Sequence, residues 1–357
     1  MKIAILGYGI VGKGVYDIVT GNKLSYIEVA KILRRKGSEK SLPIITDDFN
    51  DIINDDSIDT VVECLGGLEP ARTYVIESMK RGKNVVTSNK LLLATCYDEL
   101  IDLAHEKGVY LLFEASVGGG IPFIENLISI SRVDEITGFK GIINATINYI
   151  LYRMTKESID FDVALKEAQG KGYAEADPSS DIDGDDVLYK TIVASNVASG
   201  KSYSIDNILK FGVRNLTKED IAFFTENGLV VKLIAEYDGI NKMLLVIPEL
   251  FDKYTAIANV PLNNNYIEIT CKTEGRLSFE GQGAGRYPTA HSVVQDLVRI
   301  HQKSAKPELT TDKVVVCYKD FTDKFYVKRK GEKGHFVNGM NEKELRSDDI
   351  LFVAKVN

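Results

Sequence analysis

The chain has 357 residues and a formal net charge of −7, with 44% hydrophobic and 27% charged residues. This is the composition of a soluble globular protein with enough length for two domains. The negative charge argues against a nucleic-acid partner. No apolar run approaches the ~20 residues of a membrane-spanning helix, so no membrane partner is expected.

The cysteines predict the cellular compartment. Four of them are widely scattered, without CxxC or other metal-binding spacing: Cys64, Cys96, Cys271 and Cys317. We expect free, mostly buried thiols in a reducing cytoplasm. The N-terminal stretch has too many glycines for a signal peptide, which also favours a cytoplasmic protein.

The chain opens on a short apolar stretch followed by a glycine-rich turn. Residues 2–7 predict a strand, and the GYGIVG sequence that ends it leads into an amphipathic helix. Glycines at such a place let the backbone approach a pyrophosphate, whose charge is favoured at a helix N-terminus. The alternative is a simple glycine-rich turn. The predicted dinucleotide-binding residues here are Gly7, Gly9, Ile10, Val11 and Gly12.

The end of the second predicted strand, residues 28–33, bears on the kind of dinucleotide. An NAD-binding fingerprint expects an acidic residue there, and this chain has Arg34, Arg35 and Lys36 instead. Arginines suit a 2′-phosphate, so we expect Arg34 and Arg35 to bind NADP in preference to NAD. The alternative is that these are solvated loop charges.

Strands and helices continue to alternate up to about residue 113. Such repetition predicts an α/β fold, a doubly wound parallel sheet of the Rossmann type, in which ligands bind beyond the C-terminal ends of the strands. Glycine-rich or polar loops follow these strand ends. We expect Asn89 and Lys90, in one such loop, to bind the cofactor, with Lys90 close enough to the chemistry to be catalytic; a surface lysine is the alternative. Helices are expected at 47–54, 70–83 and 97–107, and strands at 59–64, 84–87 and 109–113.

The character of the chain then changes to α+β, with a mixed or antiparallel sheet. A second glycine-rich loop, at 281–296, leads into a helix at 289–304 that we expect to pack back on the first domain. The expected domains are residues 1–130 and 285–304 for the dinucleotide, 131–284 for substrate and dimerisation, and 305–357 as a short C-terminal extension. The expected helices are 121–131 and 146–155. The expected strands are 136–144, 229–237, 243–248, 252–260, 266–272, 313–318, 324–328 and 350–356, with hairpin signals at 238–239 and 263–265.

The acidic stretch 172–190, GYAEADPSSDIDGDDVLYK, runs into a helix predicted at 184–199. Asp186 and Lys190 are four residues apart, so they share a helix face with an apolar row. A lysine held near carboxylates in a partly dry cleft can donate a proton, while Glu175 and Asp186 can hold a substrate ammonium group. A structural ion pair is the alternative. The spacing does not fit an EF-hand, so we expect the other acidic residues upstream to be solvated or capping.

The loop after the strand at 109–113 offers oxygen ligands to a cation. Glu114 could supply a carboxylate, and Val117, Gly119 and Ile121 could supply carbonyl groups. A tight turn with a capping glutamate is an equal alternative. None of the four histidines has ligand spacing, and we assign no catalytic histidine.

Six motifs occur together: GYGIVG, TSNK, EASVGGGIP, GIINATINYIL, GYAEADPSSDIDGDDVLYK and GQGAGRYPTA. Their order and intervals, over roughly residues 1–304, resemble the homoserine dehydrogenase family. The resemblance implies NAD(P)-dependent interconversion of L-homoserine and L-aspartate 4-semialdehyde, on the way to threonine and methionine. It also implies a Rossmann domain with a dimerising substrate domain.

The same resemblance implies residue roles. Lys190 resembles the proton donor, and Lys90 the lysine near cofactor and substrate. The implied substrate-binding residues are Glu175, Asp186, Thr146, Tyr173 and Asp181. Gly172 and Gly285 resemble glycines beside the nicotinamide, and Glu114, Val117, Gly119 and Ile121 resemble a sodium site.

Two departures from the family and two alternatives remain. One departure is His291, which stands where a small serine is common in the family. The ~50 residues after 304 lack the order of the ACT regulatory domain that often ends the family, which leaves threonine feedback open. Another amino-acid-pathway dehydrogenase with this architecture is one alternative, although an aspartate-semialdehyde dehydrogenase would need a nucleophilic cysteine and base, which we do not find. A nucleotide-sensing protein without turnover is the other, and it would not explain Glu175, Asp186 and Lys190.

Overall fold

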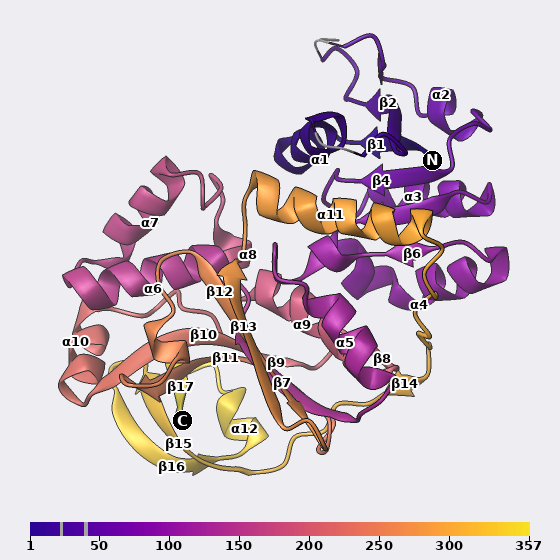
Figure 1. Cartoon of the computed structure of the whole chain (residues 1–357). Coiled ribbons are helices and arrows are strands. Elements are labelled where there is room, and N and C mark those ends of the chain that lie inside the picture. The colour runs from indigo at the N-terminus through magenta and orange to yellow at the C-terminus, as the bar shows by residue number, and fades with distance from the viewer. Residues whose placement is uncertain (22–23, 39–41) are drawn as a thin grey trace. The chain divides into compact units, whose positions relative to one another are not determined.

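The computed structural model describes residues 1–21, 24–38 and 42–357. It divides into two compact units, neither of which is one continuous stretch of chain (Figure 1). The first unit comprises residues 1–129, 200–202 and 284–313, and the second comprises 130–199, 203–283 and 314–357.

The first unit is built on a six-stranded sheet in which every pairing is parallel. The strand order β3-β2-β1-β4-β5-β6 places β1 and β4 side by side in the middle, where the direction of winding reverses. The predicted doubly wound sheet is therefore confirmed. The strands are β1 Lys2–Leu6, β2 Glu28–Leu33, β3 Ile45–Thr46, β4 Thr60–Glu63, β5 Asn84–Thr87 and β6 Leu111–Leu112.

Helices cover this sheet. The helix expected at 97–107 is the second part of α4, which follows a kink at Cys96 (φ −120°, ψ 22°). The first part begins at Lys90, where the Asn89 side chain caps it by accepting a hydrogen bond from the Leu92 N–H at 3.1 Å. No helix in the described part of the chain has both the length and the apolar character needed to cross a membrane. The helices are α1 Ile10–Gly21, α2 Asn50–Ile53, α3 Ala71–Lys80, α4 Lys90–Lys107, η1 Glu114–Ser116, α5 Phe123–Ser131 and α11 Arg286–His301.

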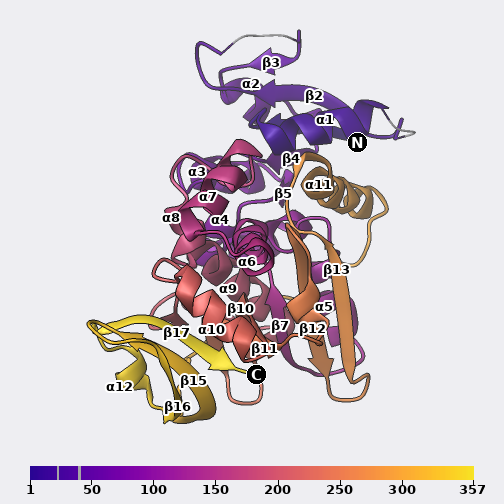
Figure 2. The same cartoon turned by 90° about the vertical axis from the view of Figure 1, so that its left-hand side faces the viewer.

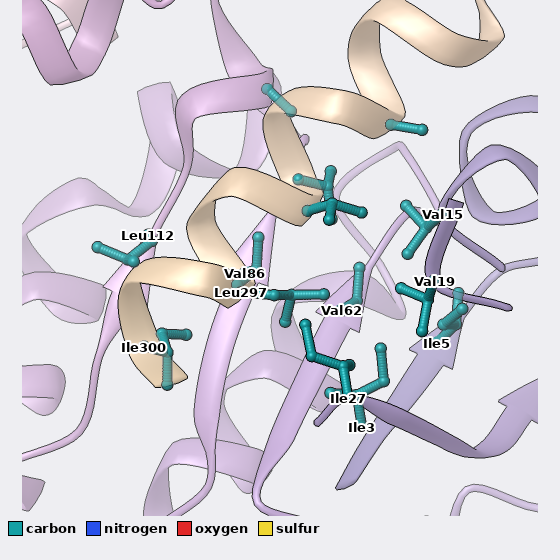
Figure 3. Packing of buried hydrophobic residues seen from close by; sticks show 14 of the residues in the cluster. Ile3, Ile5, Val15, Val19, Ile27, Val62, Val86, Leu112, Leu297 and Ile300 are labelled. Atoms are coloured by element: carbon teal, nitrogen blue, oxygen red, sulfur yellow. The ribbon is translucent and has the colours of Figure 1, made fainter. Parts of the chain in front are cut away.

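Helix α11 returns to the first unit and packs on its core (Figure 1). Val293, Leu297 and Ile300 join the cluster that contains Ile3 and Val15 (Figure 3). Helices α1 and α11 approach closely at Gly14, where an added Cβ would lie 2.8 Å from the Ala290 Cβ. An ion pair between Asp17 and Arg286 joins the same two helices.

The second unit carries a nine-stranded mixed sheet. Its order is β13-β12-β7-β10-β11-β17-β15-β16, with β9 also paired to β11. The pairings of β11 with β17 and β9 are parallel, and the others are antiparallel. The strands are β7 Ile136–Ile142, β9 Leu209–Lys210, β10 Leu229–Asp238, β11 Met243–Asp252, β12 Asn264–Cys271, β13 Arg276–Gln282, β15 Phe321–Arg329, β16 His335–Met340 and β17 Ile350–Val356.

The remaining elements connect or cover this sheet. The prediction of helices at 146–155 and 184–199 is confirmed by α6 and α9. The chain passes from one unit to the other near β8 and β14. The helices are α6 Ala145–Glu157, α7 Phe161–Gly170, α8 Ser179–Ile182, α9 Asp185–Ser199, α10 Lys218–Glu226, η2 Ile257–Asn259 and α12 Glu342–Leu345, and the two short strands are β8 Ser202–Tyr203 and β14 Lys313–Val314.

One strand prediction and one hairpin prediction were wrong. The segment 252–260 is a turn and the short helix η2, because the Asp252 side chain accepts a hydrogen bond from the Tyr254 N–H at 2.9 Å and its carbonyl accepts one from the Thr255 hydroxyl at 2.8 Å. Asn264 and Asn265 begin β12 instead of forming a hairpin turn. The hairpin predicted at Asp238 is confirmed by the antiparallel pairing of β10 with β11.

The C-terminal strands are part of the second sheet (Figure 2). They bring Lys355 into a buried group of charges on neighbouring strands, where it pairs with Glu236 and, at 3.3 Å, with Glu249. Lys140 lies 3.0 Å from the same Glu249. Residues 314–357 therefore contribute both strands and charge balance to the second unit.

Lys232 is a buried lysine bonded to neutral acceptors. Its Nζ donates to the Asn148 Oδ1 at 2.8 Å and to the Val260 carbonyl at 3.0 Å. Burial, with a smaller repulsion from Lys156, lowers the pKa of Lys232 to about 7. In the unfolded chain the pKa returns to ~10.4, so between these values the unfolded state binds more protons and stability rises with pH.

We therefore expect Lys232→Met to lose this pH dependence. From pH ~7 to ~9 the wild type should gain up to about 2 kcal/mol of unfolding free energy relative to the variant. Urea unfolding at both pH values measures the difference, and Lys166→Met, at an exposed position on α7, is the control. Parallel pH profiles for wild type and Lys232→Met would contradict the assignment.

Candidate active site

The glycine-rich turn after β1 leaves open space at the N-terminus of α1. An added Cβ on Gly7 would lie 2.7 Å from the Cys64 carbonyl oxygen, and one on Gly12 would lie 2.0 Å from the Gly7 carbonyl oxygen. At Gly9, in contrast, no atom of the described residues other than its chain neighbours lies within 4 Å of an added Cβ. Gly7 and Gly12 thus make the turn possible, and the space beside Gly9 fits a pyrophosphate.

Two neighbouring loops are joined by Glu63, the last residue of β4, which the sequence analysis missed. Its buried carboxylate accepts hydrogen bonds from the Leu65 N–H at 2.7 Å and from the Thr87 hydroxyl at 2.5 Å. Burial raises the pKa of Glu63 against these hydrogen bonds. The Asn89 amide donates to the Gly67 carbonyl at 2.7 Å, which ties the same loops together beside Lys90. The signal in the sequence was an acidic residue at the end of an otherwise apolar strand.

Arg34 and Arg35 directly follow β2. The Arg34 N–H donates to the Thr46 carbonyl at 2.8 Å, which fixes the start of this loop, and Arg35 is exposed. Burial raises the pKa of Tyr8, in the glycine-rich turn, and the charges of Arg286 and Arg34 oppose that rise. The positive charge of Arg34 is therefore close enough to the glycine-rich turn to oppose the rise in the pKa of Tyr8 there.

Glu114 lies in a buried acidic group in the first unit. Its carboxylate accepts hydrogen bonds from the Ile124 N–H at 3.0 Å and the Glu125 N–H at 2.8 Å, at the N-terminus of α5. Burial raises the pKa of Glu114 to about 7 and, with the help of Glu114, that of Asp296 to about 8. Arg299 lies 2.9 Å from Asp296 and balances the group. The alternative interpretation of Glu114 as a capping residue is therefore confirmed, since its carboxylate caps α5.

The other three residues of the predicted cation site lie in the turn that follows. The Gly119 carbonyl accepts a hydrogen bond from the Ser292 hydroxyl at 2.7 Å, the Ile121 carbonyl accepts one from the Phe123 N–H at 2.8 Å, and Val117 is fully buried. A carbonyl has two lone pairs, so one hydrogen bond leaves room for a cation. An oxygen-only set of this kind suits a hard cation. Within residues 1–21, 24–38 and 42–357, no three His, Cys, Asp or Glu side chains come together as a metal-binding group.

Lys190 and Asp186 form an ion pair on α9, in the second unit. The Lys190 Nζ lies 2.7 Å from the Asp186 Oδ2 and donates to the Ile143 carbonyl at 2.8 Å. Only 13% of the lysine side chain and 6% of the aspartate side chain are exposed. The ammonium group is therefore fixed on two sides and shielded from bulk water.

Asn144 connects this pair to Asp181. Its amide nitrogen donates to the Asp186 Oδ2 and to the Asp181 Oδ1, both at 2.7 Å. Asn144 lies in the turn between β7 and α6, and the sequence analysis gave it no role. The structure thus brings together three of the predicted residues, Lys190, Asp186 and Asp181.

Asp183 and Asp185 are partly exposed, as expected for solvated carboxylates, but each also has a cationic partner that the sequence did not predict. Asp183 makes two hydrogen bonds with the Arg214 guanidinium, at 2.7 and 2.6 Å, and Asp185 pairs with Lys210. Lys210 belongs to β9 and Arg214 follows it closely. Arg214 and Lys210 thus neutralise Asp183 and Asp185 and hold the acidic stretch against β9.

Thr146, Tyr173, Gly172 and Glu175 lie on the segments next to this group. The Thr146 hydroxyl donates to the Tyr173 carbonyl at 2.7 Å, which joins α6 to the loop after α7. Gly172 has a φ of 75°, in the left-handed region, and Gly285, in the first unit, directly precedes α11. Glu175 is exposed.

The cysteines are free but less buried than predicted. Cys271 is buried, Cys64 and Cys96 are half-buried, and Cys317 is exposed. Burial raises the pKa of the Cys64 thiol and that of the Cys96 thiol. Neither is therefore poised as a thiolate nucleophile.

The parallel sheet, its glycine-rich turn and the lysine–carboxylate pair define an NAD(P)-dependent dehydrogenase. Two family models match the chain: "Homoserine dehydrogenase, NAD binding domain" over residues 7–114 and "Homoserine dehydrogenase" over residues 122–298. The homoserine dehydrogenase of Synechocystis is 38% identical over 84% of this chain and 73% of its own length. The chain belongs to the homoserine dehydrogenase family, and it is an NAD(P)-dependent oxidoreductase that acts on a CH–OH group.

Solved structures agree. A homoserine dehydrogenase from Thiobacillus denitrificans is 29% identical with a TM-score of 0.88, over 100% of this chain and 98% of that one. One from S. aureus is 32% identical with a TM-score of 0.79, over 100% and 99%. A hyperthermophilic archaeal homoserine dehydrogenase in complex with NADPH shares the fold, at 24% identity and a TM-score of 0.73 over 86% and 99%.

Proposed function

We propose that Lys190 is the proton donor in the interconversion of L-homoserine and L-aspartate 4-semialdehyde by this chain. The observation that carries the proposal is the shielded ammonium group held between the Asp186 carboxylate and the Ile143 carbonyl. These two acceptors use two of its three N–H groups, and the third is available to a substrate oxygen.

Carboxylates of the second unit hold the substrate in this proposal. Asp186, Asp181 and Glu175 attract its ammonium group. Thr146 and Tyr173, on the neighbouring segments, also contact the substrate. Asp186 then has two functions, since the same side chain orients Lys190. Because Glu175 is exposed, it contributes to substrate binding only when the substrate ammonium group comes close to it.

The cofactor-binding residues predicted from the sequence hold the nicotinamide cofactor in this proposal. Its pyrophosphate lies at Gly7, Gly9, Ile10, Val11 and Gly12; Asn89, Lys90, Gly172 and Gly285 contact the remainder, with Lys90 near both cofactor and substrate. When bound, the nicotinamide supplies or accepts the hydride. The open space beside Gly9 supports this assignment.

We expect Arg34 and Arg35 to select NADP. Replacing either by alanine removes a charge-assisted contact to the 2′-phosphate, and kcat/KM for NADP should fall about tenfold while that for NAD changes little. Steady-state kinetics with both cofactors measures this, and Lys36→Ala is the control. A wild-type preference of tenfold or more for NAD would contradict the assignment.

Glu114 and the carbonyl groups of Val117, Gly119 and Ile121 bind a sodium ion in this proposal. The oxygen-only donor set, which includes the buried Glu114 carboxyl group, supports it. We also propose a cytoplasmic homodimer. The free thiols are consistent with a reducing compartment.

The experiment that tests the function is an assay of NADP reduction by purified protein with L-homoserine, in buffers with and without sodium. We expect turnover that needs no phosphate and is faster with sodium than with choline as the counter-ion. A protein that binds the cofactor without turnover would be a nucleotide sensor and would contradict the proposal.

A further inference from the structure

Asn144 joins two of the proposed substrate-binding carboxylates. It is buried, and each N–H of its amide donates at 2.7 Å, one to Asp181 and one to Asp186. Its Oδ1 accepts a hydrogen bond from the Ile147 N–H at 2.7 Å and so caps α6. All the hydrogen-bonding groups of this side chain are thus engaged, on one side with a helix and on the other with two acids.

The two carboxylates would repel each other without a shared donor. Lys190 contributes one positive charge, and its Nζ bonds to the same Asp186 Oδ2 that accepts from Asn144. The residue before Asn144, Ile143, supplies the carbonyl that accepts the second Lys190 hydrogen bond. Two consecutive residues, Ile143 and Asn144, therefore contact the lysine and both acids.

We propose that Asn144 is a positioning residue for the reaction, which orients Asp181 and Asp186 and through Asp186 the Lys190 ammonium. The inference rests on the proposed function and adds a residue that need not touch the substrate. Capping of α6 uses only the side-chain oxygen, whereas positioning uses the amide nitrogen. The two roles can therefore be separated by substitution.

Asn144→Ser separates them, because serine is a good helix cap and has no amide to bridge the acids. We expect kcat/KM for homoserine to fall ~10–100-fold, the range for a lost hydrogen bond to a charged group, with little change in thermal stability. The dissociation constant of the cofactor alone should not change. The matched control is Asn341→Ser. The Asn341 side chain caps α12 in the same way, and it lies far from these acids in the sequence.

Asn144→Asp gives a second, stronger variant. It keeps the shape and the capping oxygen, but it presents a third carboxylate to the other two, so a larger loss than in Asn144→Ser is expected. A double-mutant cycle of Asn144→Ser with Asp181→Ala should be non-additive, because both substitutions remove the same hydrogen bond. If Asn144 only capped the helix, the effects would add.

The outcomes separate this inference from the proposed function. If the wild type does not oxidise homoserine, the proposed function is wrong. If the wild type does, and a folded Asn144→Ser keeps its kcat/KM within twofold with additive effects in the cycle, Asn144 has no positioning role. A loss of kcat/KM accompanied by an equal loss in Asn341→Ser would also overturn it.

Discussion

Replacing Lys190 by alanine should lower kcat by ~10²–10⁴, the usual cost of losing a positioned general acid. The reason lies in the geometry, since the ammonium group is held by two acceptors and shielded from water that could replace it as a proton source. Steady-state kinetics with homoserine and NADP measures the effect.

Two comparisons keep this test specific. Lys166→Ala, on the exposed face of α7, should leave kcat unchanged. Cofactor binding by Lys190→Ala should match the wild type, because no cofactor-binding residue of the first unit is altered. If the variant retained more than half of the wild-type kcat, Lys190 would not be the proton donor.

Replacing Gly9 by alanine should abolish cofactor binding without unfolding the protein. Apart from its chain neighbours, an added Cβ at Gly9 meets no atom within 4 Å in the part of the chain that the structure describes, so the fold tolerates it. The methyl group would, however, enter the space proposed for the pyrophosphate. The dissociation constant for NADP should rise at least ~100-fold, as expected when the close backbone approach to a phosphate is blocked. Fluorescence titration with NADPH, together with a thermal melt, measures both properties.

Gly12→Ala is the matched variant for this experiment. Its Cβ would lie 2.0 Å from the Gly7 carbonyl oxygen, so it should lower the melting temperature as well as cofactor affinity. Equal NADPH affinity in Gly9→Ala and in the wild type would show that the dinucleotide binds elsewhere.

Elements with strong apolar patterns were predictable from the sequence, and those without them were not. Strands β2 and β5 have the predicted bounds. The buried Ile32 and Leu33 end β2 directly before Arg34, and the buried Val85 and Val86 of β5 lie between polar residues. Helix α7 was missed because its buried residues are two small alanines, Ala164 and Ala168, which give little periodic signal. Strand β13 was missed because it lies at the sheet edge with no residue fully buried.

The candidate site divides in the same way. The pairing of Asp186 with Lys190 follows from their spacing of four on one helix. Asn144 lies 42 positions before Asp186, and Arg214 lies 31 positions after Asp183, so only the fold brings these partners together. Nothing in the local sequence around Asn144 distinguishes a bridging amide from an ordinary helix cap.

The late position of α11 in the chain has a consequence for synthesis. Arg286 of this helix pairs with Asp17, 269 positions earlier. The apolar residues of the first unit that α11 covers are therefore translated long before α11 itself. While the ribosome translates the intervening segments, Val15 and its neighbours face solvent, and the nascent chain is exposed to aggregation. Chaperone binding during translation should therefore begin with the first parallel strands and end only when α11 emerges.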